Sequence, residues 1–130
     1  MKEFSLSRKE RLTKKKDFQT VYSAGRTIIS NSRFFKAIFY LEHSEEESGI
    51  KVAFAVHKKS GNAVWRNKVR RLLREAFRSN KKILGGFPAD QKMLLVFSNY
   101  SLNKKKHPKL KLNDLLPSVI ELMNKIKAVI

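Results

Sequence analysis

Apolar residues recur with a helical period over the middle of this chain of 130 residues. At about 100° per residue, spacings of three, four, seven and eight residues place apolar side chains on one side of a helix. Asn62 is suited to cap the start of this helix, and Gly85, Gly86 and Pro88 are suited to end it. The pattern predicts a helix of about 22 residues. Its buried positions are predicted to be Trp65, Val69, Leu72, Leu73, Ala76 and Phe77.

Two other segments have helical spacing. From Thr13 onward, Phe18, Val21 and Tyr22 share one face, and Gly25 is predicted to end this helix in the left-handed conformation. Phe18 and Tyr22 are either core residues or a stacking platform, and the pattern alone leaves both open. Residues 113–130 predict a packing helix with Pro117 in its first turn. Its apolar stripe is Leu116, Val119, Leu122 or Met123, Ile126 and Val129.

Residues 26–30, 33–41, 50–57 and 92–98 have the composition and length of strands. The continuous apolar run 92–98 indicates a strand buried on both sides, in the middle of the sheet. Alternation in 33–41 and 50–57 predicts one apolar face, with Phe35, Ala37, Phe39, Val52, Phe54 and Val56. The other face is either a solvated sheet face or a groove for unpaired bases. It carries Phe34, Lys36, Ile38, Tyr40, Lys51, Ala53, Ala55 and His57.

The length and the order of these segments predict one α+β domain over residues 1–130. The predicted order is αβββαβα, a single-domain α-β sandwich with helices packed over one sheet. Residues 1–12 are rich in Lys and Arg and are expected to form a flexible basic arm, although a solvated tail is the plainer interpretation.

The net charge of the chain limits the classes of partner that it is expected to bind. The chain has 29 Lys and Arg against 11 Asp and Glu, a net charge of +18, which favours a polyanionic partner such as RNA, DNA or an anionic membrane. The polar side of the long helix carries Asn67, Arg70, Arg71, Arg74 and Arg78, and like charges at i,i+4 destabilise a helix unless a partner offsets them. No apolar run approaches a membrane span, no signal peptide is recognisable, and a cytoplasmic location is expected.

The sequence contains few residues or motifs that are typical of a catalytic site. The sequence has no Gly-rich phosphate loop, no HExxH, no cysteine and no acidic cluster with metal-ligand spacing, so we expect no metal site and no cofactor bound by the protein alone. His43, His57 and His107 could supply the acid and base of a metal-free ribonuclease only with a mutual geometry that spacing does not give. His57 is predicted to contact a phosphate or a base, or else to be an exposed histidine at a strand end.

A dense motif occupies the start of the long helix. It comprises Lys58-Lys59, the run Gly-Asn-Ala-Val at 61–64, Arg66-Asn67-Lys68, Arg70-Arg71 and Arg74-Glu75, and it is preceded by Leu12, Lys14, Asp17-Phe18, Val21 and Gly25. This pattern closely resembles the signature of the bacterial ribonuclease P protein subunit. The last 30 or so residues match only in kind.

The resemblance implies a protein subunit that binds the catalytic RNA of ribonuclease P and the 5′ leader of precursor tRNA, and aids endonucleolytic removal of the leader. The RNA, with Mg²⁺, would perform the chemistry. It also implies a fold like domain 2 of ribosomal protein S5, with a left-handed βαβ crossover where the general rule favours a right-handed one. The residues implied to bind the catalytic RNA are Lys58, Lys59, Asn62, Arg66, Asn67, Lys68, Arg70, Arg71 and Arg74. Those implied to line the leader cleft, between the first helix and the sheet, are Lys14, Phe18, Tyr22, Phe34, Lys36, Ile38 and His57.

Two positions depart from the family pattern. Lys68 replaces an arginine, which keeps the charge but loses the planar fork that grips phosphate. Ser98-Asn99 stand where relatives often carry a basic residue facing the leader. The alternatives are a general RNA-binding or ribosome-associated protein, a self-sufficient nuclease, and a protein that binds a membrane surface.

Overall fold

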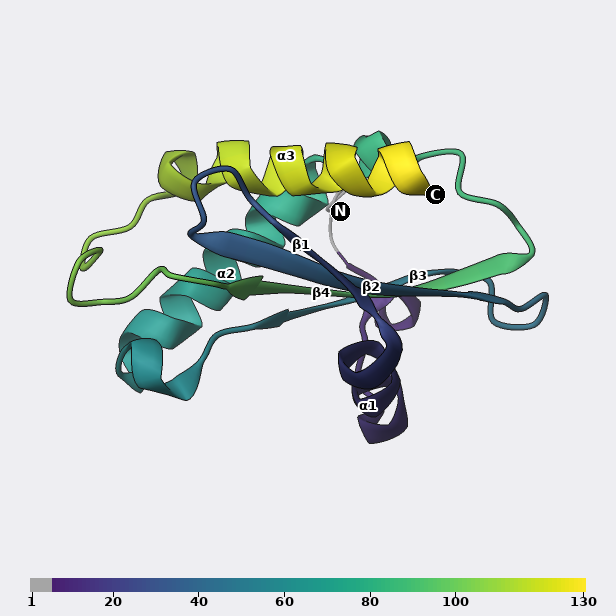
Figure 1. Cartoon of the computed structure of the whole chain (residues 1–130), viewed down its shortest axis with the longest axis horizontal. Coiled ribbons are helices and arrows are strands. Elements are labelled where there is room, and N and C mark those ends of the chain that lie inside the picture. The colour runs from purple at the N-terminus through teal and green to yellow at the C-terminus, as the bar shows by residue number, and fades with distance from the viewer. Residues whose placement is uncertain (1–5) are drawn as a thin grey trace.

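Residues 6–130 are described by a computed structural model, in which one sheet separates two layers of helices (Figure 1). Helices α2 and α3 cover one face of the sheet, and α1 lies alone on the other (Figure 1). The predicted α+β class is confirmed. The chain runs through α1 (Lys15–Ala24), β1 (Arg26–Ile29), β2 (Phe35–His43), β3 (Gly49–Ala55), α2 (Ala63–Ser79), β4 (Gln91–Asn99) and α3 (Leu112–Val129).

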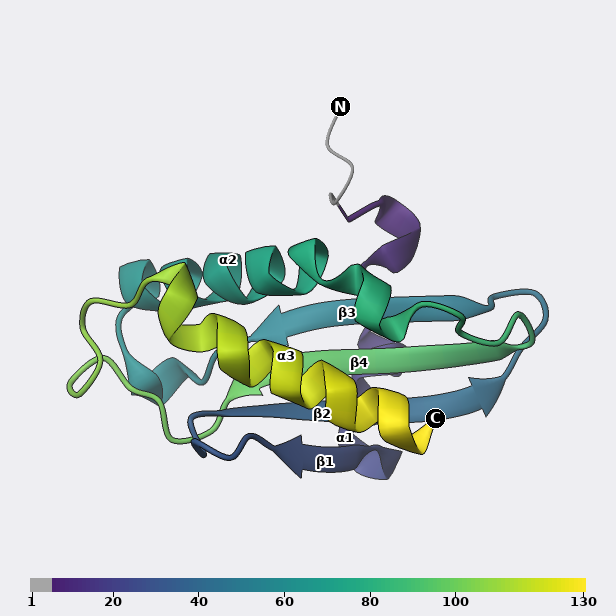
Figure 2. The same cartoon turned by 90° about the horizontal axis from the view of Figure 1, so that it is seen from above.

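The sheet has the strand order β1-β2-β4-β3. Strand β4 pairs antiparallel with β2 and parallel with β3, so its central position, predicted from its unbroken apolar run, is confirmed (Figure 2). Every residue from Lys92 to Asn99 is buried. The connection from β3 through α2 to β4 joins two parallel strands, and its left-handedness stays a prediction.

The strands divide their side chains between two apolar clusters, as the alternation predicted. Phe35, Ala37 and Phe39 of β2 lie in the large cluster with α2 and α3. Ile38 belongs to a smaller cluster with Leu12, Val21, Leu94 and Val96, beneath α1. The large cluster therefore anchors α2 and α3, and the small cluster anchors α1.

Lys92 is a buried basic residue at the start of β4, and it forms ion pairs with two acids of the segment 42–48. Its Nζ lies 2.9 Å from Glu47 and 3.8 Å from Glu42. Burial lowers the pKa of Lys92, but the hydrogen bond to Glu47 and nearby carboxylates outweigh burial, so the pKa is raised above 10.5. Lys92 therefore stays charged and paired with Glu47 near the start of the central strand β4.

Helix α2 spans 17 residues, so the prediction of about 22 residues is wrong at its C-terminal end. The start is confirmed, because Asn62 Oδ1 accepts a hydrogen bond from the Trp65 N–H at 3.0 Å. At the other end the Asn80 side chain donates to the Ala76 carbonyl at 2.8 Å, and Lys81–Leu84 continue as a 3-10 helix. All six apolar positions predicted to be buried are buried.

Helix α3 begins at Leu112, which places Pro117 at its sixth position, in the second turn and not in the first. The buried stripe begins at Leu115, whereas Leu116 is half-buried and Val129 is 44% exposed. The predicted stripe was therefore one residue out at its start and too long at its end. Val119, Leu122, Met123 and Ile126 are buried as predicted.

Gly25 ends α1, but its φ of −76° is ordinary extended backbone, so the prediction of a left-handed glycine is wrong. The need for glycine is steric. A Cβ at this position would lie 2.4 Å from the Val21 carbonyl oxygen and 2.9 Å from Ile38 Cγ2. The close approach lets the chain pass directly from α1 into β1 beside β2.

Residues 6–12 pack against the protein, so the flexible arm predicted for residues 1–12 is wrong for this part; residues 1–5 lie outside the described residues. Leu6 and Leu12 are buried in the two apolar clusters. The Leu12 N–H donates to the Val52 carbonyl at 2.9 Å, and Glu10 pairs with Lys81 at 2.9 Å. The segment extends the sheet beyond β3 and connects it to the end of α2.

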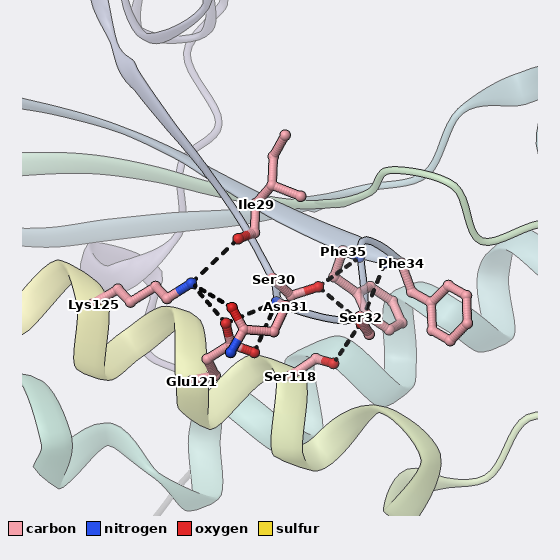
Figure 3. Close-up of polar contacts among 9 residues, drawn as sticks. All are labelled: Ile29, Ser30, Asn31, Ser32, Phe34, Phe35, Ser118, Glu121 and Lys125. Atoms are coloured by element: carbon pink, nitrogen blue, oxygen red, sulfur yellow. Dashed lines mark hydrogen bonds and ion pairs between the residues drawn. The ribbon is translucent and has the colours of Figure 1, made fainter.

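The turn between β1 and β2 is tied to α3 by polar contacts (Figure 3). The Asn31 N–H donates to both carboxylate oxygens of Glu121, at 3.1 and 2.8 Å, and Lys125 pairs with Glu121 at 2.8 Å (Figure 3). Ser32 and Ser118 share a hydrogen bond of 3.3 Å. These contacts fix the point where β2 begins, and with it the position of Phe34.

Candidate nucleic-acid interface

The first candidate surface is the exposed side of α2 together with the short 3-10 helix Lys58–Ser60 that precedes it. In the described part of the chain, no Lys or Arg of this surface forms an ion pair, and Glu75 is its one acid. We call it the α2 surface. It contains all nine residues predicted to bind the catalytic RNA, namely Lys58, Lys59, Asn62, Arg66, Asn67, Lys68, Arg70, Arg71 and Arg74.

Local hydrogen bonds orient the α2 surface. Asn62 caps the helix, Arg66 Nε donates to the Gly61 carbonyl at 3.1 Å, and Arg70 donates to Asn67 Oδ1. A guanidinium has five N–H donors, so Arg66 and Arg70 keep most of theirs for another acceptor. The exposed side of α2 therefore presents fixed donors and uncompensated positive charge, while its other side is anchored in the core. Such a surface suits a phosphate backbone.

The second candidate surface lies on α1. The rings of Phe18 and Tyr22 are nearly parallel, with centroids 6.4 Å apart and planes 18° apart. Tyr22 is 54% exposed, and partial burial raises the pKa of its hydroxyl above 10.0, so it is neutral at physiological pH. Phe18 is half-buried against the small cluster, and Lys14 is exposed at the N-cap of α1. An aromatic pair beside a lysine suits an unpaired nucleotide.

Three of the remaining residues predicted to bind the leader lie on or near the sheet face that α1 covers. Ile38 is only 7% exposed and lies beneath α1, where it supports the helix more than it faces solvent. Lys36 is half-buried and pairs across the sheet with Ile29 and Ser98. His57 is exposed, two residues after the end of β3 at Ala55.

Phe34 lies apart from this group, so its predicted place between α1 and the sheet needs correction. It packs against the large cluster, on the side of α2 and α3, and its ring meets that of His107 edge-on at 4.6 Å. The strand β2 begins only at Phe35, so the alternation that assigned Phe34 to the α1 face does not extend to it.

A groove of about 630 Å³ lies between the two surfaces, and the sequence analysis missed it. Phe18 of α1, Phe54 of β3 and Arg74 of α2 line it, together with Arg11 and Arg78. The Nε of Arg78 is buried and has no hydrogen-bond partner among residues 6–130. The sequence placed Arg78 on the polar side of the long helix and Phe54 on the apolar face of the sheet, but nothing in it indicated that they share a groove with Arg11, because long-range packing of the N-terminal segment brings them together.

Asn99 explains one departure from the family pattern. It is 1% exposed, its Oδ1 accepts from the His57 N–H at 3.0 Å, and its Nδ2 donates to the Leu102 carbonyl at 2.9 Å. Both bonds are buried or partly buried, so Asn99 fixes the end of β3 and the segment after β4. Ser98 is buried opposite Lys36 and Ala55.

Residues 6–130 contain neither a membrane-spanning helix nor a metal-binding cluster. In that part of the chain no helix is long and apolar enough to cross a membrane. The same residues hold no cluster of three or more His, Cys, Asp or Glu side chains placed to bind a metal ion.

Solved structures share this fold. A ribonuclease P protein from Thermotoga maritima superposes with a TM-score of 0.66, at 21% identity, over 89% of this chain and 96% of that protein. A Staphylococcus aureus RNase P protein gives a TM-score of 0.64 at 23% identity, over 91% of this chain and 95% of that protein. At these identities the likeness shows the fold.

Sequence relatives extend the likeness to the family. The ribonuclease P protein component of Nitrosococcus oceani is 34% identical over 109 residues, which cover 83% of this chain and 82% of that protein. That of Bacillus velezensis is 38% identical over 79 residues, 61% of this chain and slightly under two thirds, 65%, of that protein. The sequence model of the ribonuclease P family matches residues 6–127. The chain therefore belongs to the ribonuclease P protein family.

Proposed function

We propose that this chain is the protein subunit of a ribonuclease P holoenzyme, in which it binds the catalytic RNA through the α2 surface. The observation that carries the proposal is the unpaired charge of that surface on a helix whose other side is fully anchored in the core. Helix α2 cannot turn its basic side away from a partner without leaving the sheet. Family membership points to ribonuclease P RNA as the polyanion.

We further propose that the single-stranded 5′ leader of precursor tRNA binds on the α1 side of the sheet. Phe18 and Tyr22 offer stacking faces, and Lys14 and Lys36 offer charge. The groove with Arg74 and Arg78 connects this side to the α2 surface, which supports a path for RNA between them. The chain would thereby hold substrate and catalytic RNA together in the cytoplasm, while the RNA, with Mg²⁺, cleaves the phosphodiester bond.

Reconstitution at low Mg²⁺ tests the proposal. Adding the protein to ribonuclease P RNA should increase cleavage of leader-bearing precursor tRNA more than cleavage of a substrate with a one-nucleotide leader. No gain for the leader-bearing substrate would contradict the proposal and favour a general RNA-binding or ribosome-associated protein. The protein alone should leave precursor tRNA intact, and cleavage at the mature 5′ end without the RNA would favour a self-sufficient nuclease.

The salt dependence of binding tests the α2 surface. Each lost phosphate contact lowers the slope of log affinity against log salt by about 0.7 to 0.9. Arg70→Ala and Arg74→Ala should each show this decrease in binding to ribonuclease P RNA. Lys127→Gln, at the far end of α3, removes one charge away from the α2 surface and serves as the control. Unchanged slopes in both arginine variants would reject the assignment of these residues.

A further inference from the structure

The segment between β4 and α3, residues 100–111, is strongly basic and is not part of either surface described above. It contains five lysines and no acid, and in the described part of the chain none of these ammonium groups forms an ion pair. We call it the lysine loop. Its lysines are Lys104, Lys105, Lys106, Lys109 and Lys111.

The lysine loop is anchored at both ends. The Tyr100 N–H donates to the Phe34 carbonyl at 2.7 Å, and the Ser101 N–H donates to the Arg33 carbonyl at 3.1 Å. Leu102 and Leu110 are buried in the large cluster. A loop with two buried leucines and paired backbone groups is ordered before any partner binds, so binding would cost it little conformational entropy.

The middle of the loop docks on the start of α2 (Figure 2). The Lys104 N–H donates to the Ser60 carbonyl at 2.7 Å, and Trp65 Nε1 donates to the His107 carbonyl at 2.9 Å. The approach is close, because a Cβ on Gly61 would lie 3.0 Å from Lys104 Cβ and 2.6 Å from the Trp65 ring. The loop lysines therefore extend the positive charge of the α2 surface beyond its N-terminal end.

A pocket of about 390 Å³ opens beside the loop. Phe34 and His107, packed edge to face at 4.6 Å, line it with Leu102, Lys106 and Lys109. Asp114 also lines it, and its Oδ2 accepts a hydrogen bond from the Lys111 N–H at 2.7 Å. The Nδ1 of His107 is buried, and no described residue forms a hydrogen bond with it. Aromatic walls, an unused hydrogen-bonding nitrogen and two lysines are the features that bind an unpaired base and its flanking phosphates.

We propose that the lysine loop and this pocket are a second contact for the catalytic RNA, in which the lysines bind phosphates and the pocket receives one unpaired base. The inference rests on the proposed function. The inference adds a second RNA contact to that function. This contact lies at the opposite end of α2 from the arginine-lined groove and on the opposite side of the sheet from α1. The leader would not reach it.

The phosphate contacts are tested with Lys105→Gln/Lys106→Gln. Lys82→Gln/Lys127→Gln, which removes the same charge beyond the other end of α2, is the matched control. Binding to ribonuclease P RNA is measured over a range of salt concentrations. The loop variant should lose about 1.4 to 1.8 units of log-log slope, by the usual 0.7 to 0.9 per phosphate, and the control less than about half a unit. Equal slopes in the two variants would overturn the proposal.

The base contact is tested with His107→Leu, which keeps the backbone carbonyl that Trp65 uses. Binding to the RNA should weaken by about fivefold or more with an unchanged salt slope, and His107→Phe should restore most of it, because stacking is the larger part of such contacts. Preference for leader-bearing substrate should stay as in the unmodified protein. If the unmodified protein binds the RNA but His107→Leu binds equally well, this inference fails alone; if the unmodified protein does not bind, the proposed function fails too.

Discussion

Phe18 and Tyr22 lie one turn apart on α1, yet they have different surroundings. Phe18 is half-buried against the small cluster, and Tyr22 is more exposed than buried. Tyr22→Ala should therefore leave the melting temperature nearly unchanged while reducing the preference for leader-bearing substrate, because stacking contributes about 1–3 kcal/mol per base. Phe18→Ala should reduce both, since it also removes part of the packing beneath α1.

Thermal melting and cleavage of substrates with long and short leaders measure the two effects. Tyr22→Phe keeps the ring and is the control for Tyr22→Ala. If Tyr22→Ala retained the full preference for leader-bearing substrate, the aromatic pair would be structural and the leader would bind elsewhere. A fall in catalytic-RNA affinity equal to the fall in leader preference would also contradict the assignment.

Individual side chains were predictable where strand alternation governs them. Phe35, Ala37 and Phe39 point into the large cluster as predicted, and Ile38 points the other way. Phe34 was misplaced because it precedes the strand, where the period of two no longer applies. The bond between Asn99 and His57 could not be predicted, because His57 lies 42 residues away in sequence and only the folded chain brings the two together.

Asn62 caps α2 and is also one of the residues proposed to bind RNA. Its side chain caps the helix through the Trp65 N–H, and replacing such a cap by alanine costs about 0.5–2 kcal/mol. Asn62→Ala should lower the free energy of unfolding by that amount. Asn62→Asp keeps the cap and favours the helix dipole, but it adds a negative charge to the α2 surface, so it should preserve stability and weaken binding to RNA.

Urea unfolding and RNA affinity distinguish the two roles. Ala63→Ser, one residue further on at an exposed position, is the control for a change of side chain without loss of the cap. Stability unchanged in Asn62→Ala would mean that the cap contributes nothing. RNA affinity unchanged in Asn62→Asp would place the phosphates away from this end of α2.

The ends of α2 differed in how far sequence could define them. An asparagine followed by helical spacing predicted the start correctly. The end was predicted too late because the prediction relied on Gly85, Gly86 and Pro88 as stop signals, whereas α2 ends at Ser79 and Lys81–Leu84 form a 3-10 helix. The Asn80 side chain, bonded back to Ala76, ends the helix before the glycines do.

The N-terminal segment is joined to the end of α2 by Glu10 and Lys81, and this contact should depend on pH. Burial raises the pKa of Glu10, but the Ser7 N–H and Lys81 together outweigh it and hold the pKa below 4.5. A lowered folded-state pKa gives stability that is fully present above 4.5 and is lost as the pH falls through the folded-state value. Glu10→Gln should therefore cost about 0.2–1 kcal/mol at neutral pH and nothing in acid.

Unfolding free energies of the two proteins, measured from neutral pH to below the pKa of Glu10, test this contact. Glu45→Gln removes an exposed acid of the β2–β3 segment that forms no ion pair in the described part of the chain, and it should show no such pH-dependent difference. A difference for Glu10→Gln that persists or grows in acid would show that the charge is not the cause.

At the scale of the whole molecule, composition did not predict the path of the chain at its N-terminal end. A run of Lys and Arg near the N-terminus favours a mobile arm, and it conceals Leu6 and Leu12, which are buried in two different clusters. Their spacing of six residues would place both on one face of a strand, whereas the folded segment buries them in different clusters. The groove between α1 and α2 depends on this packing, so it could not be predicted before the N-terminal segment was placed.

The net charge of +18 acts in opposite directions on folding and on RNA binding. Self-repulsion destabilises the compact state, and salt screens it over a Debye length that falls from about 10 Å at 0.1 M to about 3 Å at 1 M. The melting temperature of the protein alone should therefore rise with NaCl, by about 3–6 °C for each kcal/mol of repulsion removed. Its affinity for RNA should fall over the same range, because counterion release drives binding.

Removing charge from one helix tests the source of the repulsion. Arg70→Gln/Arg74→Gln takes two neighbours at i,i+4 from the α2 surface, so it should melt at a higher temperature than the unmodified protein at low salt and respond less to NaCl. Lys82→Gln/Lys127→Gln removes the same charge without removing an i,i+4 pair inside an α-helix, because Lys82 lies in the 3-10 helix beyond the end of α2, and its salt response should change less. The melting temperatures of the two variants and of the unmodified protein are measured over a range of NaCl concentrations. NaCl is used because a salt such as sulfate would also bind to the basic sites.

A melting temperature that falls with NaCl would mean that native ion pairs, and not repulsion, dominate the electrostatics of the free protein. An equal response in the two variants would show that the repulsion is spread over the molecule and is not concentrated on α2, where the catalytic RNA is proposed to offset it.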